Sequence, residues 1–106
     1  MEVTMPIKLV PTYDLKNIKK VFCSSDKLVM TSSAKKGQVS LGFSEEDVVD
    51  AIQALKKADF YKSMPPVHQA FSAWQDVYKA RFKAVDLYIK FQVNMKRELI
   101  LSFKGK

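Results

Sequence analysis

Alternating apolar and polar residues near the C-terminus constrain the fold of this chain more than any other feature. In residues 85–93 every second side chain is apolar, and the side chains between them are polar or tyrosine. The alternation returns in residues 98–104, after a turn at residues 94–97. Because successive side chains of a strand point to opposite faces of a sheet, the pattern predicts two antiparallel strands with one buried face. The other face would present Tyr88, Lys90, Ser102 and Lys104.

The N-terminal half is predicted to form helices. One covers residues 15–25, where Asp14 can cap the first turn and apolar residues recur at helical spacing, with Cys23 as a small buried residue on it. A second helix begins at Ser44, and Asp47 three residues later nearly completes a capping box. Residues 26–43 are expected to hold a short apolar piece and a turn or short helix, and residues 74–78 a short strand. Helices followed by strands predict an α+β fold, a two-layer sandwich with N-terminal helices packed on a C-terminal antiparallel sheet.

The length of 106 residues predicts a single domain over residues 1–106. No apolar run approaches the ~20 residues of a membrane-spanning helix, and the first residues lack the pattern of a secretory signal. A single cysteine excludes a disulfide within the chain, and His68 as the single histidine excludes a two-histidine ribonuclease site and Cys/His zinc clusters. We therefore expect a cytoplasmic protein without a metal or other cofactor.

The net charge of +7 is unevenly distributed along the chain. Residues 1–43 carry a balance of +4, residues 44–61 of −3 and residues 62–106 of +6. Two basic segments indicate a polyanionic partner, most commonly a nucleic acid. A solvated surface tuned for solubility explains the same charge, and so does an acidic protein partner.

The polar face of the predicted sheet has two interpretations. Lysine supplies charge for a phosphate backbone, and tyrosine can stack on a base or move a proton, so the face suits RNA. The ordinary explanation is that such a face is the hydrated side of an antiparallel sheet.

Three segments bear on this choice, and they occur in a fixed order. They are DFYKSM at residues 59–64, WQDVY at residues 74–78 and LSFK at residues 101–104, with the strand motif YIK at residues 88–90 lying before the last. Together they closely resemble the MqsR toxin family, the motility quorum-sensing regulators of type II toxin–antitoxin systems. The resemblance is strong from residue 44 to the end, whereas residues 1–43 match in outline only.

The resemblance implies a RelE/YoeB-like fold and a ribosome-independent mRNA endoribonuclease, or mRNA interferase. It also implies a cognate antitoxin with a zinc-binding domain and a helix-turn-helix domain, which we expect along an exposed sheet edge. The functional residues of the family fall on Lys62, Gln75, Tyr88 and Lys104, and its arginine after WQDVY falls on Arg81. Arg81, together with Lys79 and Lys90, is the expected RNA-binding set.

These residue types can support metal-independent RNA cleavage through the ribose 2′-OH. Lys62, Lys104 and Arg81 would stabilise the charged phosphorane, and Gln75 would orient the substrate because an amide does not titrate. Tyr88 can act as proton donor or base. A lysine whose pKa is lowered by neighbouring cations can also serve as base. The sequence leaves the assignment of base and acid open.

An alternative function is a non-catalytic RNA- or protein-binding module on the same fold. The chain also departs from the family at two places that border the expected site. Residues 83–85 read Lys-Ala-Val where the family often has glycine, and the loop after Met64 carries two prolines. Both changes can alter the rim that selects the RNA sequence, but neither removes a candidate catalytic group.

Overall fold

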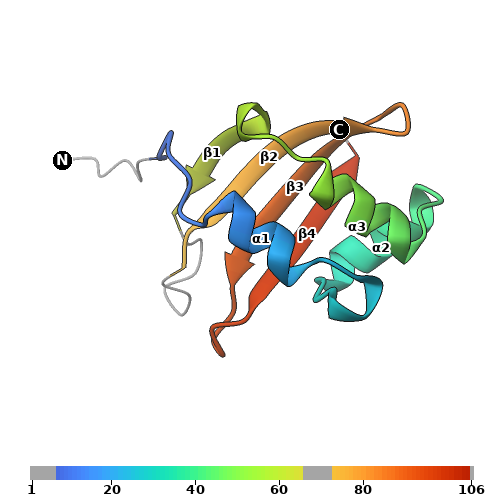
Figure 1. Ribbon diagram of the computed structural model, residues 1–106, viewed down its shortest axis with the longest axis horizontal. Helices are drawn as coiled ribbons and strands as arrows, with labels where there is room; N and C mark the ends of the chain where they lie inside the picture. The colour runs from blue at the N-terminus through green and yellow to red at the C-terminus, as the bar shows by residue number, and fades with distance from the viewer. Residues whose placement is uncertain (1–6, 66–72, 106) are drawn as a thin grey trace.

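A computed structural model of the chain describes residues 7–65 and 73–105. Four strands form one antiparallel sheet in sequential order (Figure 1): β1 Phe60–Met64, β2 Gln75–Phe82, β3 Val85–Val93 and β4 Leu99–Gly105. The strand predicted at residues 85–93 is confirmed, and the following strand is displaced by one residue at each end. The strand expected at residues 74–78 begins one residue later, at Gln75, and continues to Phe82 as β2, which turns tightly into β3.

Three helices precede the sheet: α1 Leu15–Val21, α2 Ser32–Ser40 and α3 Glu45–Gln53. Two 3-10 turns, η1 Ser25–Lys27 and η2 Lys57–Asp59, connect them to their neighbours. In Figure 1, α1 and α3 lie across one face of the sheet and α2 lies near β4. The α+β fold predicted from the sequence, with helices packed on an antiparallel sheet, is confirmed.

The first helix ends four residues earlier than predicted. Phe22 leaves helical geometry at φ −103° and ψ 52°, and Ser24 is extended. The Ser24 hydroxyl donates to the Asp26 carboxylate, a local hydrogen bond of the kind that competes with helix continuation. Cys23 therefore lies beyond the helix and is exposed, so the prediction that it is buried was wrong.

The capping box predicted at the start of α3 is present. The Ser44 side chain accepts from the Asp47 backbone N–H at 3.1 Å, and the Asp47 carboxylate accepts from the Ser44 N–H at 2.9 Å. These two bonds satisfy donors that a helix end leaves unpaired. They fix where α3 begins and thereby which of its faces meets the sheet.

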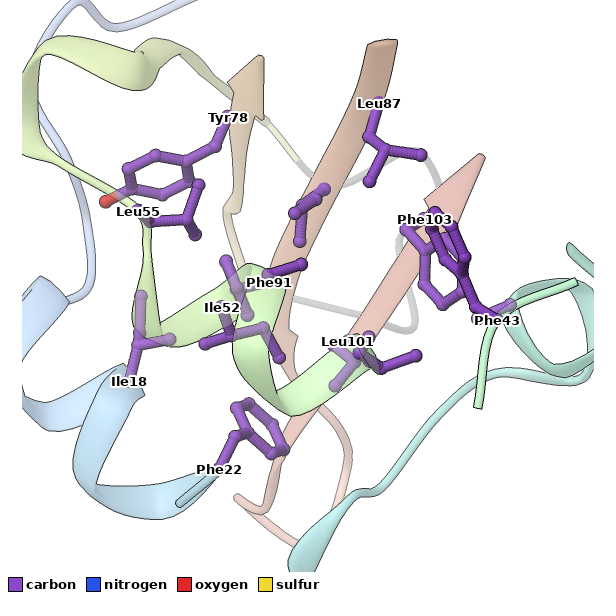
Figure 2. Packing of buried hydrophobic residues seen from close by; sticks show 14 residues of the cluster. Ile18, Phe22, Phe43, Ile52, Leu55, Tyr78, Leu87, Phe91, Leu101 and Phe103 are labelled. Atoms are coloured by element: carbon purple, nitrogen blue, oxygen red, sulfur yellow. The ribbon is translucent and has the colours of Figure 1, made fainter. Parts of the chain in front are cut away.

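The hydrophobic core lies between the helices and one face of the sheet (Figure 2). The Phe22 ring stacks on Phe91 at 6.0 Å between centroids, and the Tyr78 ring meets Phe91 edge-on at 5.8 Å. Apolar side chains from the helical half of the chain and from β3 and β4 complete the core, chiefly Ile18, Ile52, Leu55, Leu87, Ile89, Leu101 and Phe103. Since one sheet face is occupied by this core, the side chains of alternate parity lie on the other face.

Short backbone pairings cover part of each outer strand. On β1, Lys8 and Ser63 exchange two backbone hydrogen bonds of 2.8 Å. On β4, Leu101 bonds the segment around Met30, donating to the Val29 carbonyl at 2.9 Å. The backbone groups that an edge strand exposes are thus partly satisfied from within the chain.

Candidate functional site

Cross-strand pairing brings the polar residues of the sheet into rows on the face opposite to the core. One row runs across all four strands as Lys62, Val77, Lys90 and Ser102. The neighbouring row contains Lys79, Tyr88 and Lys104 on β2, β3 and β4. Residues far apart in sequence therefore become direct neighbours, because paired side chains on one sheet face lie close together.

A depression of about 280 Å³ lies over these rows. Its lining consists of Tyr61, Lys62, Met64, Val77, Tyr88, Lys90 and Lys104. Val77 is only 2% exposed although it faces away from the core, so the surrounding side chains cover it. The depression thus combines an apolar floor with three lysine ammonium groups and two tyrosines. Among the described residues, no carboxylate lines it.

A β-bulge brings two consecutive residues of β1 to this site. The register shifts between Phe60 and Lys62, so Tyr61 is left without a partner on β2. The Lys79 ammonium lies 3.7 Å from the Tyr61 ring centroid and the Lys62 ammonium 5.0 Å from it. Strict strand alternation would place only one of the two on this face. Sequence reasoning missed Tyr61 and Met64, and no pattern in the sequence marks the bulge.

The charge around Lys90 alters its titration. Burial and the positive charges of Lys104 and Lys62 lower the pKa of Lys90 below its usual range. Both effects disfavour the ammonium form. The depression therefore holds a lysine that gives up its proton more readily than a solvated one.

Gln75 and Arg81, two further residues of the expected site, lie outside the depression. The Gln75 amide donates to the Gln92 side chain at 3.1 Å. Gln75 lies opposite Met64 on β1, and Gln92 lies two residues after Lys90 on β3. Arg81 pairs with Asp86 at 3.3 Å near the β2–β3 turn, and both side chains are more than half exposed. The structure therefore brings together Lys62, Tyr88, Lys90 and Lys104, with Lys79 beside them, and leaves Gln75 and Arg81 at the periphery.

The described part of the chain offers neither a clustered metal-ligand set nor a membrane-spanning helix. In residues 7–65 and 73–105 no three His, Cys, Asp or Glu side chains gather as a metal site would require. No helix in those ranges has the length and apolarity to cross a membrane. His68 lies outside the described residues.

Comparison with known proteins identifies the family of the chain. The family model described as motility quorum-sensing regulator, toxin of MqsA, matches residues 10–105. The match includes α1 and α2, where the sequence motifs indicated resemblance in outline only. The mRNA interferase toxin MqsR of Escherichia coli (strain K12) is 33% identical over 99 residues, which cover 93% of this chain and 98% of that protein. The chain therefore belongs to the MqsR toxin family.

Proposed function

We propose that this chain is an endoribonuclease that cuts mRNA without the ribosome, in the depression on the open sheet face. The observation that carries the proposal is the convergence of Lys62, Tyr88 and Lys104 from three strands on one apolar floor. Membership of a family whose relative is named an mRNA interferase toxin supports the substrate. A sheet face that serves only to contact water would not be expected to gather three lysines around a buried valine.

The charge of the depression suits a phosphodiester. Lys62 and Lys104 supply positive charge from the two outer strands, and among the described residues no lining carboxylate opposes it. Cations fixed in a partly dehydrated site stabilise developing negative charge better than solvated ones do. Lys79 and Arg81 extend the positive charge along β2 toward the β2–β3 turn, where further phosphates of an RNA strand would bind.

The reaction that fits these groups is transesterification by the ribose itself. The 2′-OH loses its proton and its oxygen attacks the adjacent phosphorus, while the bond from phosphorus to the 5′-oxygen breaks. The products are a 2′,3′-cyclic phosphate and a 5′-OH. Lys62 and Lys104 stabilise the phosphorane, and Tyr88 donates a proton to the leaving 5′-oxygen. Gln75 orients the RNA from the rim through its amide.

The partner of the toxin is an antitoxin of the MqsA type. The family is described as the toxin of MqsA, and we propose that the cognate antitoxin here carries a zinc-binding domain and a helix-turn-helix domain. An acidic surface on that antitoxin would complement the net charge of +7. Because each outer strand is partly paired within the chain, the antitoxin would bind beside these pairings or displace them.

Cleavage of a long defined RNA, without ribosomes and with EDTA present, tests the proposal. Wild type should cut at a recurring short motif, and Lys62→Ala should slow cleavage by at least about 100-fold. Mapping of the 5′ ends should show 5′-OH groups. A substrate with one 2′-deoxynucleotide on the 5′ side of the cut should resist cleavage at that bond only.

Lys36→Ala provides a matched control, because Lys36 is an exposed lysine of α2, which packs beside β4, and it does not line the depression. It should cut at the wild-type rate. Wild type that binds the RNA without cutting it would show a binding module instead of a nuclease. Equal cutting of the 2′-deoxy bond would refute the mechanism through the 2′-OH.

A further inference from the structure

We propose that Lys90 is the general base, whose Nζ takes the proton from the attacking 2′-OH. This inference rests on the proposed nuclease function and deepens it, since it names the group that begins the reaction. The role differs from that of a phosphate-binding cation, which the sequence alone suggested for Lys90.

The position of Lys90 in the sheet supports this role. It lies on β3, an interior strand, and pairs with Val77 on one side and Ser102 on the other. Lys62 follows Val77 in the same row on the outer strand β1, and Lys104 lies on the outer strand β4. Lys90 is therefore the lysine nearest the middle of the depression, with a cation on each side of it.

The groups that surround Lys90 on this face of the sheet are cationic or neutral. β1 contributes Lys62 and Tyr61, β2 contributes Lys79, and β4 contributes Lys104. On its own strand the nearest residue of this face toward the turn is Tyr88. The carboxylates of these strands lie elsewhere: Asp76 is buried beneath the sheet and Asp86 pairs with Arg81 near the turn. Among the described residues, nothing near Lys90 carries the negative charge that would hold its proton.

This arrangement divides the chemical work between three lysines. The proton on Lys90 is destabilised by burial and by its two cationic neighbours, and its pKa is lowered accordingly. Lys62 and Lys104 remain as the cations that stabilise the phosphorane. The 2′-OH proton passes to the Nζ lone pair of Lys90, the 2′-oxygen bonds to phosphorus, the bond to the 5′-oxygen breaks, and Tyr88 protonates that oxygen. Lys90 then returns its proton to solvent, and Tyr88 regains one from solvent.

A substitution that keeps the charge but removes the base tests the role. Lys90→Arg should lower single-turnover cleavage of a short oligoribonucleotide by about 100-fold or more, because a guanidinium stays protonated. Its affinity for the same oligonucleotide with a 2′-deoxy cut site should not fall, since the substitution removes no positive charge. Lys36→Arg, on the exposed side of α2, is the matched control and should cut normally.

The pH dependence of the cleavage rate gives a second readout. Substitution of Lys90 would not change it if Lys90 had only a structural or electrostatic role. For wild type the rate should rise tenfold per pH unit below the pKa of Lys90, and Lys90→Arg should lose this limb. Added ethylamine should restore part of the activity of Lys90→Ala. Cleavage by Lys90→Arg within about threefold of wild type would overturn the proposal.

NMR of protein labelled with ¹³C at the lysine ε carbon separates the two proposals. Lys90, assigned from the signal missing in Lys90→Arg, should titrate below the usual range of lysine. If wild type cuts RNA but Lys90 titrates within the usual range of lysine, the base assignment fails and the nuclease stands. If wild type does not cut the RNA, the nuclease fails and Lys90 has no reaction to serve.

Discussion

Ser63 on β1 lies directly opposite Asp76 on β2, and its hydroxyl donates a 2.7 Å hydrogen bond to the Asp76 carboxylate. Both side chains are fully buried. The same carboxylate accepts from the backbone N–H groups of Thr12 and Tyr13 at 2.8–3.0 Å. The next pair in the register is Lys62 and Val77, and both of these side chains lie on the opposite face of the sheet from Ser63 and Asp76. Asp76 thus ties the segment before α1 to the two strands that carry one wall of the site.

Asp76→Asn should destabilise the fold strongly. Each carboxylate oxygen accepts from a backbone N–H, so either orientation of the amide turns an NH₂ donor toward another donor. We expect the free energy of unfolding to fall by roughly 3 kcal/mol, because buried donors lose a charged acceptor. Urea denaturation measures the loss. Asp86→Asn removes an exposed carboxylate and should cost less than about 1 kcal/mol; equal losses would contradict the argument.

Ala84→Gly should stabilise the β2–β3 hairpin. Phe82 pairs with Val85, so the turn consists of Lys83 and Ala84, with φ values of 49° and 63°. A side chain at such a φ costs about 1 kcal/mol that glycine does not, and the free energy of unfolding should rise by about that amount. Ala54→Gly at the end of α3, where φ is −82°, should instead lower it. Changes of the same sign in thermal or urea unfolding would refute this reading of the turn.

The sequence predicts the centre of the site better than its edges. Residues 85–93 alternate without interruption, so parity alone places Tyr88 and Lys90 on one face. The following strand puts Lys104 on the same face, and the antiparallel register then pairs it with Tyr88. Fold class and three members of the depression therefore follow from periodicity, because a sheet with one buried face tolerates no slip of register.

Other features depend on tertiary contacts that no local pattern records. The bulge at Tyr61 changes parity within a five-residue strand, and only the register with β2 reveals it. Asp76 resembles an ordinary polar residue within WQDVY, but its partners Thr12 and Tyr13 lie more than sixty positions away. The membership of Lys62 in the site was predicted from family resemblance, since alternation from Phe60 gives the opposite face.

The stability of the fold should decline at alkaline pH through Tyr78. Burial, followed by the negative charges of Asp76 and Asp14, raises the pKa of Tyr78 from 10.0 to about 12. The raised value means that folding favours the neutral phenol, so this contribution is complete below pH 10 and is lost as the pH rises toward 12. Tyr78→Phe should flatten the fall of the unfolding free energy between pH 10 and 12, measured in urea. Parallel pH curves for the two proteins would contradict the prediction.

The Gln75–Gln92 pair should act in RNA cleavage as one unit. Gln75 lies directly opposite Met64, a residue that lines the depression, and its amide bonds to Gln92, which lies two residues after Lys90 on the same face of β3. If Gln75 orients the RNA, loss of the hydrogen bond to Gln92 should move the Gln75 amide out of position. Gln92→Leu should therefore lower cleavage by about tenfold, in the same direction as Gln75→Leu. The double variant should be little worse than the more damaged single variant, because coupled residues are not additive. Single-turnover rates for the four proteins complete this cycle, with Gln38→Leu on α2 as a control for loss of an amide. Additive losses, or a Gln92→Leu protein that cuts as fast as wild type, would mean that Gln75 works without its partner.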